Sequence, residues 1–573
     1  MPVRPALRLA TLGLGLALAA TLAHAEPTAP AQSALDAPLF YEILAGEVLA
    51  REGAALEAVQ ALLAAAERSR DPALYQRAVE VAAQAHRGDL ARAVAQAWQR
   101  TLPHDVDADR TLLQLAVALR EPQAVAAPLA RLIEGLPLPE RAGVIASVPR
   151  FLAGLTDKSA AYAAARTALE PQAATTGLMV PVEVSLGRLA LAAGDTIAAA
   201  RRAQRAAAAD PDAPGPALLA LELLETTPAV QPLLDAYLAR PNAAAQVRLA
   251  YARVLADQNL LAPAAAQAQR AAETDPALGT AWLTLAAYRV ELREPAATLA
   301  ALARWRALPP EGDAAALAQA RRFADLLAAQ AAFHQGDLAA TAQSLQAIPP
   351  EEASLSVLLL RARLLAREGR LAEARSLLQS GAAADNPTPL TRARAEVQLL
   401  SDERQWRAAL QVLDAARARF PDSQDLVLEW ARVAEQLGRY DDAERELRAL
   451  LAKSPNDAHL RNALGYALAD RGVHLTEAQD LLRSAHTSRP SNPYITDSVG
   501  WLAYRQGRPA EALPLLQASF DAHPHAEVAA HLGEVLWVLG RQDEARAILR
   551  DGLARDAGNT VLTETLRRLG IGL

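Results

Sequence analysis

Three of the ten histidines lie close together in the sequence, at His523, His525 and His531. Imidazole nitrogens at such short spacing are common ligands of transition metals. Two of these histidines flank Pro524, however, and no paired carboxylate motif stands near them. We therefore interpret the cluster as two loop residues and one helix residue, and we predict no metal site.

The carboxylates show no pattern that favours acid–base catalysis. Runs such as Asp441-Asp442 and Glu444-Arg445-Glu446 are typical of the solvated face of a helix. General acid–base chemistry requires a pocket that tunes two carboxylates differently, and the sequence singles out no such pair. Beyond residue 25 we find no H-E-x-x-H, G-x-S-x-G, S-x-x-K or G-x-x-x-x-G-K-[ST] motif. We therefore predict no catalytic residues and no cofactor, and we expect a protein that is not an enzyme.

The composition indicates an all-α protein. Of the 573 residues, 52% are hydrophobic but only 4% are aromatic, so most of the apolar content is alanine and leucine, which favour helices. The net charge of −7 argues against nucleic-acid binding, which requires a basic surface. The chain has no cysteine, which excludes disulfides, thiolate metal sites and a lipid-modified cysteine.

The first 25 residues have the pattern of a secretory signal peptide. Arg4 and Arg8 give a basic start, and the run from Leu9 to Leu22 is apolar or small. The residues Ala23-His24-Ala25 then fit the small-x-small pattern that precedes signal peptidase cleavage. The alternative is an uncleaved membrane anchor, but an apolar run of about 14 residues is short for a bilayer, which needs roughly 20. We expect export, and in a Gram-negative cell this means the periplasm, with or without association with the outer membrane.

Small residues and prolines recur about every 34 residues in the C-terminal third. A repeat of this length suits a pair of antiparallel helices. The early glycine would let the second helix approach the first, with the alanine as its small partner, and the later glycine would end the first helix. The proline would end the second helix. The four registers are Pro421, Pro455, Pro490 and Pro524; Gly438, Gly472, Gly507 and Gly540; Ala443, Ala478, Ala512 and Ala545; and Gly465, Gly500 and Gly533.

The same spacing continues toward the N-terminus, and Trp282-x-x-Leu285-Ala286 resembles the W-x-x-L-G opening of the tetratricopeptide repeat (TPR). The resemblance covers roughly residues 39–573 and is strong after about residue 180. It implies a right-handed solenoid of antiparallel helix pairs. Further residues at these registers are Gly187, Gly194, Ala199, Ala206, Pro211, Ala264, Ala271 and Pro276.

We predict five segments along the chain. Residues 101–180 and 212–243 lack clean phasing, and we interpret them as bends or short units. The last helix would cover the apolar end of the stack. The segments are a signal peptide at 1–25, a flexible leader at 26–38, degenerate helical repeats at 39–180, TPR-like repeats at 181–558 and a capping helix at 559–573.

The resemblance also implies which residues face a binding groove. In TPR stacks, positions 2, 5, 9, 12 and 13 of the first helices line the concave face. Aromatic residues with a polar tip are favoured anchors at interfaces, although some could instead fill space between neighbouring first helices. If they bind a partner, Tyr494, Trp501, Tyr504 and Trp537 should be partly exposed. The predicted groove residues are His459, Asn462, Tyr466, Tyr494, Asp497, Trp501, Tyr504, Arg505 and Trp537.

One TPR subclass clamps the C-terminal carboxylate of a peptide with lysine, arginine and asparagine. Here Asn462 is present, but no lysine is nearby and Tyr466 stands where a second asparagine is expected. We therefore expect an extended or helical segment of a partner protein instead.

The N-terminal residues Tyr41–Glu47, Arg70-Asp71-Pro72 and Trp98 are similar to the start of long proteobacterial envelope proteins with TPRs. Some of these are outer-membrane lipoproteins that present cell-wall hydrolases to a carboxyl-terminal processing protease. The resemblance implies a periplasmic adaptor in envelope assembly or in substrate delivery to a protease, with other envelope proteins as partners and no integral membrane segment in the mature chain. The missing lipobox cysteine departs from that pattern. The alternatives are a subunit of a polysaccharide or protein export machine and, from another class, a helical enzyme that acts on the cell wall.

Overall fold

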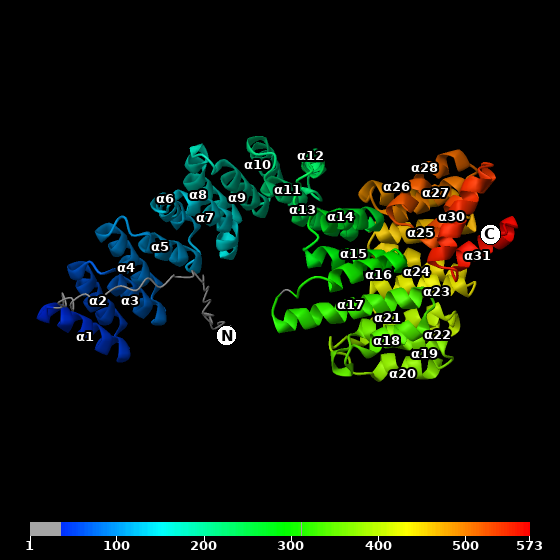
Figure 1. Ribbon diagram of the computed structural model, residues 1–573, viewed down its shortest axis with the longest axis horizontal. Helices are drawn as coiled ribbons and strands as arrows, with labels where there is room; N and C mark the ends of the chain where they lie inside the picture. Colours follow the sequence, from blue (N-terminus) through cyan, green and yellow to red (C-terminus); the bar gives the residue numbers. More distant parts are fainter. Residues whose placement is uncertain (1–35, 311) are drawn as a thin grey trace. The chain divides into compact units, whose positions relative to one another are not determined.

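The computed structural model describes residues 36–310 and 312–573, and within them it contains helices and no strand (Figure 1). The chain divides into two compact units. One consists of the described residues up to Val144 together with Arg150–Leu169, and the other of Ile145–Pro149 together with Glu170–Leu573. The predicted signal peptide and nearly all of the predicted leader lie outside the described residues.

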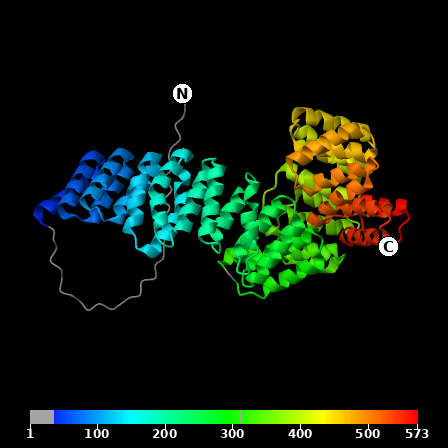
Figure 2. The same cartoon turned by 90° about the horizontal axis from the view of Figure 1, so that it is seen from above.

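The first unit is a row of antiparallel helices that lie side by side in chain order in Figure 2. The first helix begins at Ala37, two residues before the predicted start of the helical region, because the Asp36 carboxylate caps it by accepting a hydrogen bond from the Leu39 amide at 2.7 Å. The helices are α1 Ala37–Arg51, α2 Ala55–Ser69, α3 Pro72–Gln84, α4 Gly88–Thr101, α5 Val106–Ala118, η1 Pro122–Ala124, α6 Ala126–Gly135, α7 Leu138–Phe151, which both units share, η2 Leu152–Gly154 and α8 Lys158–Leu169.

The second unit holds the remaining helices, mostly in antiparallel pairs such as α25 with α26 and α27 with α28. They are η3 Glu170–Ala174, α9 Met179–Ala192, α10 Thr196–Ala209, α11 Pro214–Leu223, η4 Pro228–Val230, α12 Gln231–Leu238, α13 Ala245–Asp257, α14 Leu261–Thr274, α15 Gly279–Glu291, α16 Pro295–Arg306, α17 Ala314–His334, α18 Leu338–Gln346, η5 Pro350–Glu352, α19 Leu355–Arg367, α20 Leu371–Ser380, α21 Pro389–Asp402, α22 Trp406–Arg419, α23 Gln424–Gln436, α24 Tyr440–Lys453, α25 Ala458–Arg471, α26 Leu475–Ser488, α27 Pro493–Arg505, α28 Pro509–Ala522, α29 Ala526–Val538, α30 Gln542–Arg555 and α31 Thr560–Leu569.

The later glycines and the prolines do what their spacing predicts. Gly507 and Gly540 follow the ends of α27 and α29 in the left-handed conformation, both with a φ of 79°. Pro455, Pro490 and Pro524 each stand two residues after the end of a second helix. These residues therefore set the length of each helix in the pair.

The early glycines allow close helix contact, but the group that they accommodate is not the predicted alanine. A Cβ atom added to Gly465, Gly500 or Gly533 would lie 2.6–2.8 Å from a leucine Cγ atom on the second helix. Each leucine stands four residues, or one helical turn, after the register alanine, which is itself fully buried. The three leucines are Leu482, Leu516 and Leu549.

The stretches with irregular sequence phasing are also irregular in structure. Residues 101–180 contain η1, η2 and η3, and residues 212–243 contain η4 and the eight-residue helix α12. Pro149 lies inside α7, where it removes a helical hydrogen bond. The regular succession of two α-helices per repeat is therefore interrupted in these stretches.

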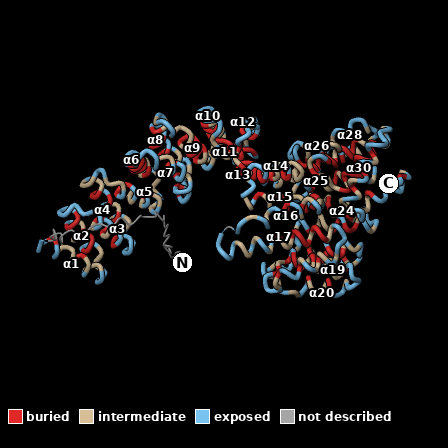
Figure 3. Tube along the Cα trace, viewed as in Figure 1, coloured by how far each residue is buried: buried red, intermediate tan, exposed pale blue. Residues whose placement is uncertain are grey.

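Alanine and leucine form most of the core, and buried positions alternate with exposed ones along the helices (Figure 3). At the C-terminal end, Leu562 and Ile571 pack against Leu549, Ala526 and Ala530. The helix α31 thus occupies the place predicted for the capping helix.

Candidate protein-binding groove

Neighbouring helix pairs contact each other through their first helices. The helix α27 packs against both α25 and α29, and α17 likewise packs against α15 and α19. In a curved stack, the layer in which the helices of neighbouring pairs contact each other directly is the inner layer, because the helices are closest together there. We therefore call the open surface of the first helices α15 to α29 (α15, α17, α19, α21, α23, α25, α27 and α29) the inner face.

Two predicted groove residues, Asp497 and Trp501, are buried and cannot meet a partner directly. Trp501 is 5% exposed, and its ring stacks on the His531 imidazole with the centroids 4.1 Å apart. Nδ1 of His531 lies 3.0 Å from the nearer carboxylate oxygen of Asp497. The expectation that Trp501 is partly exposed is thus wrong, because its ring fills the space between neighbouring first helices.

Three tyrosines of the predicted groove are hydrogen-bonded to polar side chains that lie further along the chain. Tyr466 donates to Glu527 and Tyr504 donates to Glu534, both at 2.8 Å. The hydroxyl of Tyr494 lies 3.1 Å from Nε2 of His523. The bond from Tyr504 joins the consecutive first helices α27 and α29, and the bond from Tyr466 joins α25 to α29, two repeats further on.

The network continues around Asp470, at the end of α25. Asp470 accepts a hydrogen bond from Nε1 of Trp501 at 3.0 Å, and its backbone carbonyl accepts one from Arg505. The guanidinium of Arg505 also lies over the Trp501 ring, 5.8 Å from the centroid. Arg505 therefore stabilises the contact between α25 and α27.

Other predicted residues remain accessible. Tyr494 is 43% exposed and His459 is exposed at the start of α25. Trp537 is half-buried beneath Arg546, whose guanidinium lies 5.2 Å from the ring centroid. Asn462 is half-buried, and its Oδ1 atom is buried without a hydrogen-bond partner among the described residues. These side chains, together with the half-buried Tyr504, are the ones that a partner would contact.

Carboxylates gather on the inner face beside these aromatic residues. Burial, reinforced by Asp470 and Glu527, raises the pKa of Glu435 to about 7. Burial alone would lower the pKa of His531, but the carboxylates of Asp497, Glu527 and Asp470 outweigh it and raise this pKa to about 8. The sequence analysis missed Glu435, although it stands three residues before Gly438, as Tyr504 and Trp537 stand before their glycines.

The three clustered histidines do not share one site. His523 hydrogen-bonds Tyr494, whereas His531 bonds Asp497. Burial, with smaller contributions from His525 and Arg555, lowers the pKa of His523 to about 4. Within the described residues, no group of three or more histidine or carboxylate side chains is arranged to hold a metal ion.

A hollow that the sequence analysis missed opens on the inner face between α19, α21 and α23. Its volume is about 480 Å³. On its wall Arg394 donates to Glu429 at 2.6 Å, while the guanidinium of Arg432 is exposed. The other lining residues include Ser356, Leu359, Thr391 and Gln398. Counting back from Gly369 and Gly438 places Ser356, Leu359 and Arg432 at groove positions, so the repeat register could have identified them.

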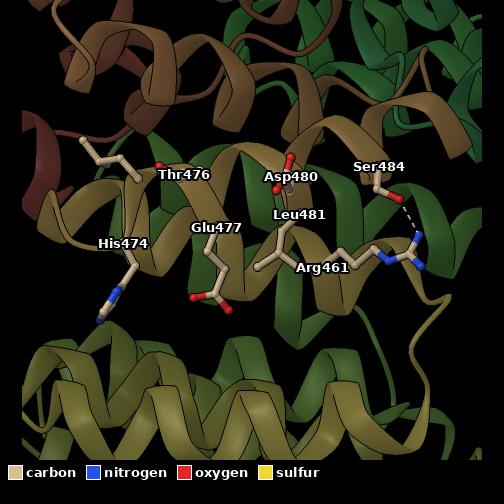
Figure 4. Close-up of a pocket in the computed structure, with 8 residues that line it drawn as sticks. Arg461, His474, Thr476, Glu477, Asp480, Leu481 and Ser484 are labelled. Carbon is tan, nitrogen blue, oxygen red and sulfur yellow. Dashed lines mark hydrogen bonds between the residues drawn. The ribbon is translucent and has the colours of Figure 1, made fainter.

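A larger pocket, of about 640 Å³, lies beside α26, a second helix, and so outside the inner face (Figure 4). Arg461 and Ser484 lie at one end of it, joined by a 2.6 Å hydrogen bond, and His474 lies at the other. Its Glu477 is paired with Arg448. None of its lining residues has a buried polar atom without a partner, so the inner face remains the better candidate site.

Comparison with known proteins agrees with this architecture. Two family models, each described as a tetratricopeptide repeat, match residues 400–465 and 500–560. A TPR repeat-containing protein of Pseudomonas aeruginosa is 32% identical over 203 residues, which is 35% of this chain and 34% of the relative. The matched part thus amounts to about a third of that relative's length.

Similar solved structures are also TPR proteins. One from Parabacteroides merdae is 17% identical with a TM-score of 0.33, and it matches 44% of this chain and 99% of its own. Another from Thermus thermophilus is 23% identical with a TM-score of 0.28, and it matches 31% of this chain and 96% of its own. The family-model matches show that residues 400–465 and 500–560 contain tetratricopeptide repeats, and the observed helix pairs form an all-α, TPR-type solenoid.

Proposed function

We propose that this protein is a non-catalytic scaffold that binds a segment of another protein along its inner face. Tetratricopeptide repeats indicate a protein–protein interaction scaffold. The observation that carries the proposal is that half-exposed aromatic residues, Tyr504 and Trp537, share the inner face with an open hollow lined by Arg394 and Arg432. Aromatic and arginine side chains are the residues most enriched in binding hot spots.

The cellular setting is part of the same proposal. The signal-peptide pattern of residues 1–25 supports export, and the similarity of the N-terminal repeats to envelope adaptors supports a role in envelope assembly or in delivering substrates to a protease. No helix among the described residues is long and apolar enough to cross a membrane. N-terminal sequencing of protein from the envelope fraction should find Glu26 first, whereas intact Met1 would contradict export.

Crosslinking and affinity purification from envelope extract would test the binding surface. The double variant Tyr504→Ala with Trp537→Ala should lose partner capture, because an anchor residue typically contributes 2 kcal/mol or more, about thirtyfold in affinity. Tyr440→Ala is a matched control, because Tyr440 is a 45% exposed aromatic residue on the second helix α24. Equal capture by both variants would contradict binding through the inner face.

A further inference from the structure

The turn between α30 and α31 lies against helix ends that are far away in the sequence. Arg555 donates a hydrogen bond to the Leu292 carbonyl at 2.6 Å, and Arg293 donates one to the Arg555 carbonyl at 3.3 Å. Arg404, just after α21, donates to the Gly558 carbonyl at 2.8 Å. We call these residues, Leu292–Glu294, Arg404 and Arg555–Gly558, the seam.

Charges and helix packing support the same contact. Arg555 lies 3.7 Å from Glu294, and Arg293 lies 3.8 Å from Asp556. Nearby, α14, green in Figure 1, packs against α28, orange in the same view. The repeats from α14 to α31 therefore close on themselves.

Two of the seam arginines stand where other repeats have glycine. Arg293 and Arg404 follow the ends of α15 and α21, and each has a φ of 54°. At the equivalent position, Gly336, Gly369 and Gly438 adopt this left-handed conformation without a Cβ atom. Asn259, at the same position after α13, has a φ of 62°, so a residue with a side chain is tolerated there. Both arginine side chains reach the C-terminal turn.

The closed seam lies at the edge of the inner face, where α15 and α21 end. His334, at the end of α17, lies among Arg293, Arg363 and Asp556, and burial, with the two arginines, lowers its pKa to about 4. Tyr494 of the predicted groove is close enough to Glu291, at the end of α15, for the carboxylate to affect it. The seam thus places the C-terminal turn beside the ends of the first helices α15 and α21.

Besides the packing of α14 on α28, the seam is held by three arginine hydrogen bonds to backbone carbonyls and by two ion pairs. The ion pair between Arg293 and Asp556 is 3.8 Å wide, with side chains 43% and 30% exposed, whereas Arg555 is 13% exposed. Pairs of this kind contribute little and weaken as salt is added. Higher salt, or the removal of one seam arginine, should therefore weaken the seam without changing the packing inside the helix pairs.

We propose that the seam is a clasp: the turn Asp556–Gly558 detaches from α15 and α21 to open the inner face and returns to close it. The functional importance of the clasp rests on the proposed binding at the inner face. Its opening is a property of the free protein, so it is measured without any partner. Failure of the clasp and failure of the binding proposal are thus distinguishable.

Distance measurement between two spin labels tests the closure. Because the chain has no cysteine, Ala296→Cys and Ala557→Cys, both at exposed positions beside the seam, label the full chain uniquely. We expect one narrow, short distance at low salt, and a second, longer population after Arg404→Gln or at high salt. The control Arg541→Gln removes an exposed arginine that pairs only within its own turn, with Glu544, and should leave the distance unchanged. A broad distribution in the parent, or an unchanged one in Arg404→Gln, would overturn the proposal.

The titration of His334 gives an independent readout. Arg404 is not among the groups that shift the pKa of His334, so removing its charge has no direct effect. If Arg404→Gln opens the clasp, water reaches the imidazole and its pKa, followed by NMR, should rise from about 4 toward 6.5. A pKa that stays near 4 together with an unchanged label distance would show that the seam is a fixed structural contact.

Discussion

The indole ring of Trp501 stacks on the imidazole of His531, with the centroids 4.1 Å apart and the planes 17° from parallel. Trp501 belongs to α27 and His531 to α29, so this contact joins two consecutive repeats. Nδ1 of the same imidazole is hydrogen-bonded to the carboxylate of Asp497, which also belongs to α27. Of the aromatic residues predicted to bind a partner, Trp501 is therefore buried, whereas others such as Trp537 are half-buried.

Trp501→Ala and Trp537→Ala should behave oppositely. Removing the buried indole leaves a cavity between α27 and α29 and should lower the free energy of unfolding by about 3–5 kcal/mol. Removing the half-buried Trp537 should cost clearly less stability but weaken partner capture. Urea unfolding followed by circular dichroism measures the first effect. Equal destabilisation by the two substitutions would mean that Trp537 is also part of the core.

The buried His531–Asp497 pair should make stability fall at mildly alkaline pH. The pKa of His531 is about 8 in the folded protein, above its ordinary value of about 6.5. The folded state therefore binds the proton more tightly, and this stabilisation is complete below pH 6.5 and is lost as the pH rises through 8. A shift of this size corresponds to about 2 kcal/mol. Asp497→Asn removes the largest favourable charge and should abolish the decline, and persistence of the decline in that variant would point to another group.

His523 should produce the opposite dependence in a lower window. Its folded pKa of about 4 lies below the ordinary value, so the unfolded chain binds the proton more tightly. Stability should therefore decrease as the pH falls from 6.5 toward 4. Thermal unfolding of His523→Gln between pH 4 and 6.5 should show a shallower slope than the parent protein, and an identical slope would exclude His523 as a contributor.

The contact between Gly500 and Leu516 can be tested by exchanging volume. Gly500→Leu places a side chain against Leu516, which a Cβ atom alone would already approach to 2.8 Å. Overpacking of this kind typically costs about 1–3 kcal/mol. Adding Leu516→Ala frees space, so the double variant should be more stable than the sum of the two single changes predicts. Additive effects would show that the two residues do not share this space.

Removing residues 561–573 should cause self-association. The deletion uncovers Leu549, Ala526 and Ala530, which Leu562 and Ile571 now cover. An exposed apolar repeat end favours association. Deleting only the exposed Gly572 and Leu573 is a matched control, since the apolar contact remains. Sedimentation velocity would detect the difference, and a monomeric deletion variant would show that α31 is dispensable as a cap.

The repeat architecture could be predicted from the sequence because the residue at each register determines the structure of its own helix end or helix contact. The left-handed Gly507 and the helix-ending Pro490 act within a few residues of their own positions. The burial of Trp501 was not predictable in the same way, since it depends on His531, which was interpreted as an ordinary helix residue. Arg293 and Arg404 depart from the glycine register, but Arg120 and Asn259 do so as well, so this departure alone does not mark the seam. The partners of Arg293 and Arg404, which are Arg555 and Gly558, follow no repeat and required the structure.

The seam also affects the order of folding. Contacts within a helix pair join residues that are near each other in the sequence, and such contacts form quickly. The hydrogen bonds between Arg555 and the α15 end join residues 262 and 263 positions apart. Closing so long a loop has a large entropic cost and becomes favourable only after the intervening repeats have stacked. The inner face therefore stays open during folding until the C-terminal turn has docked.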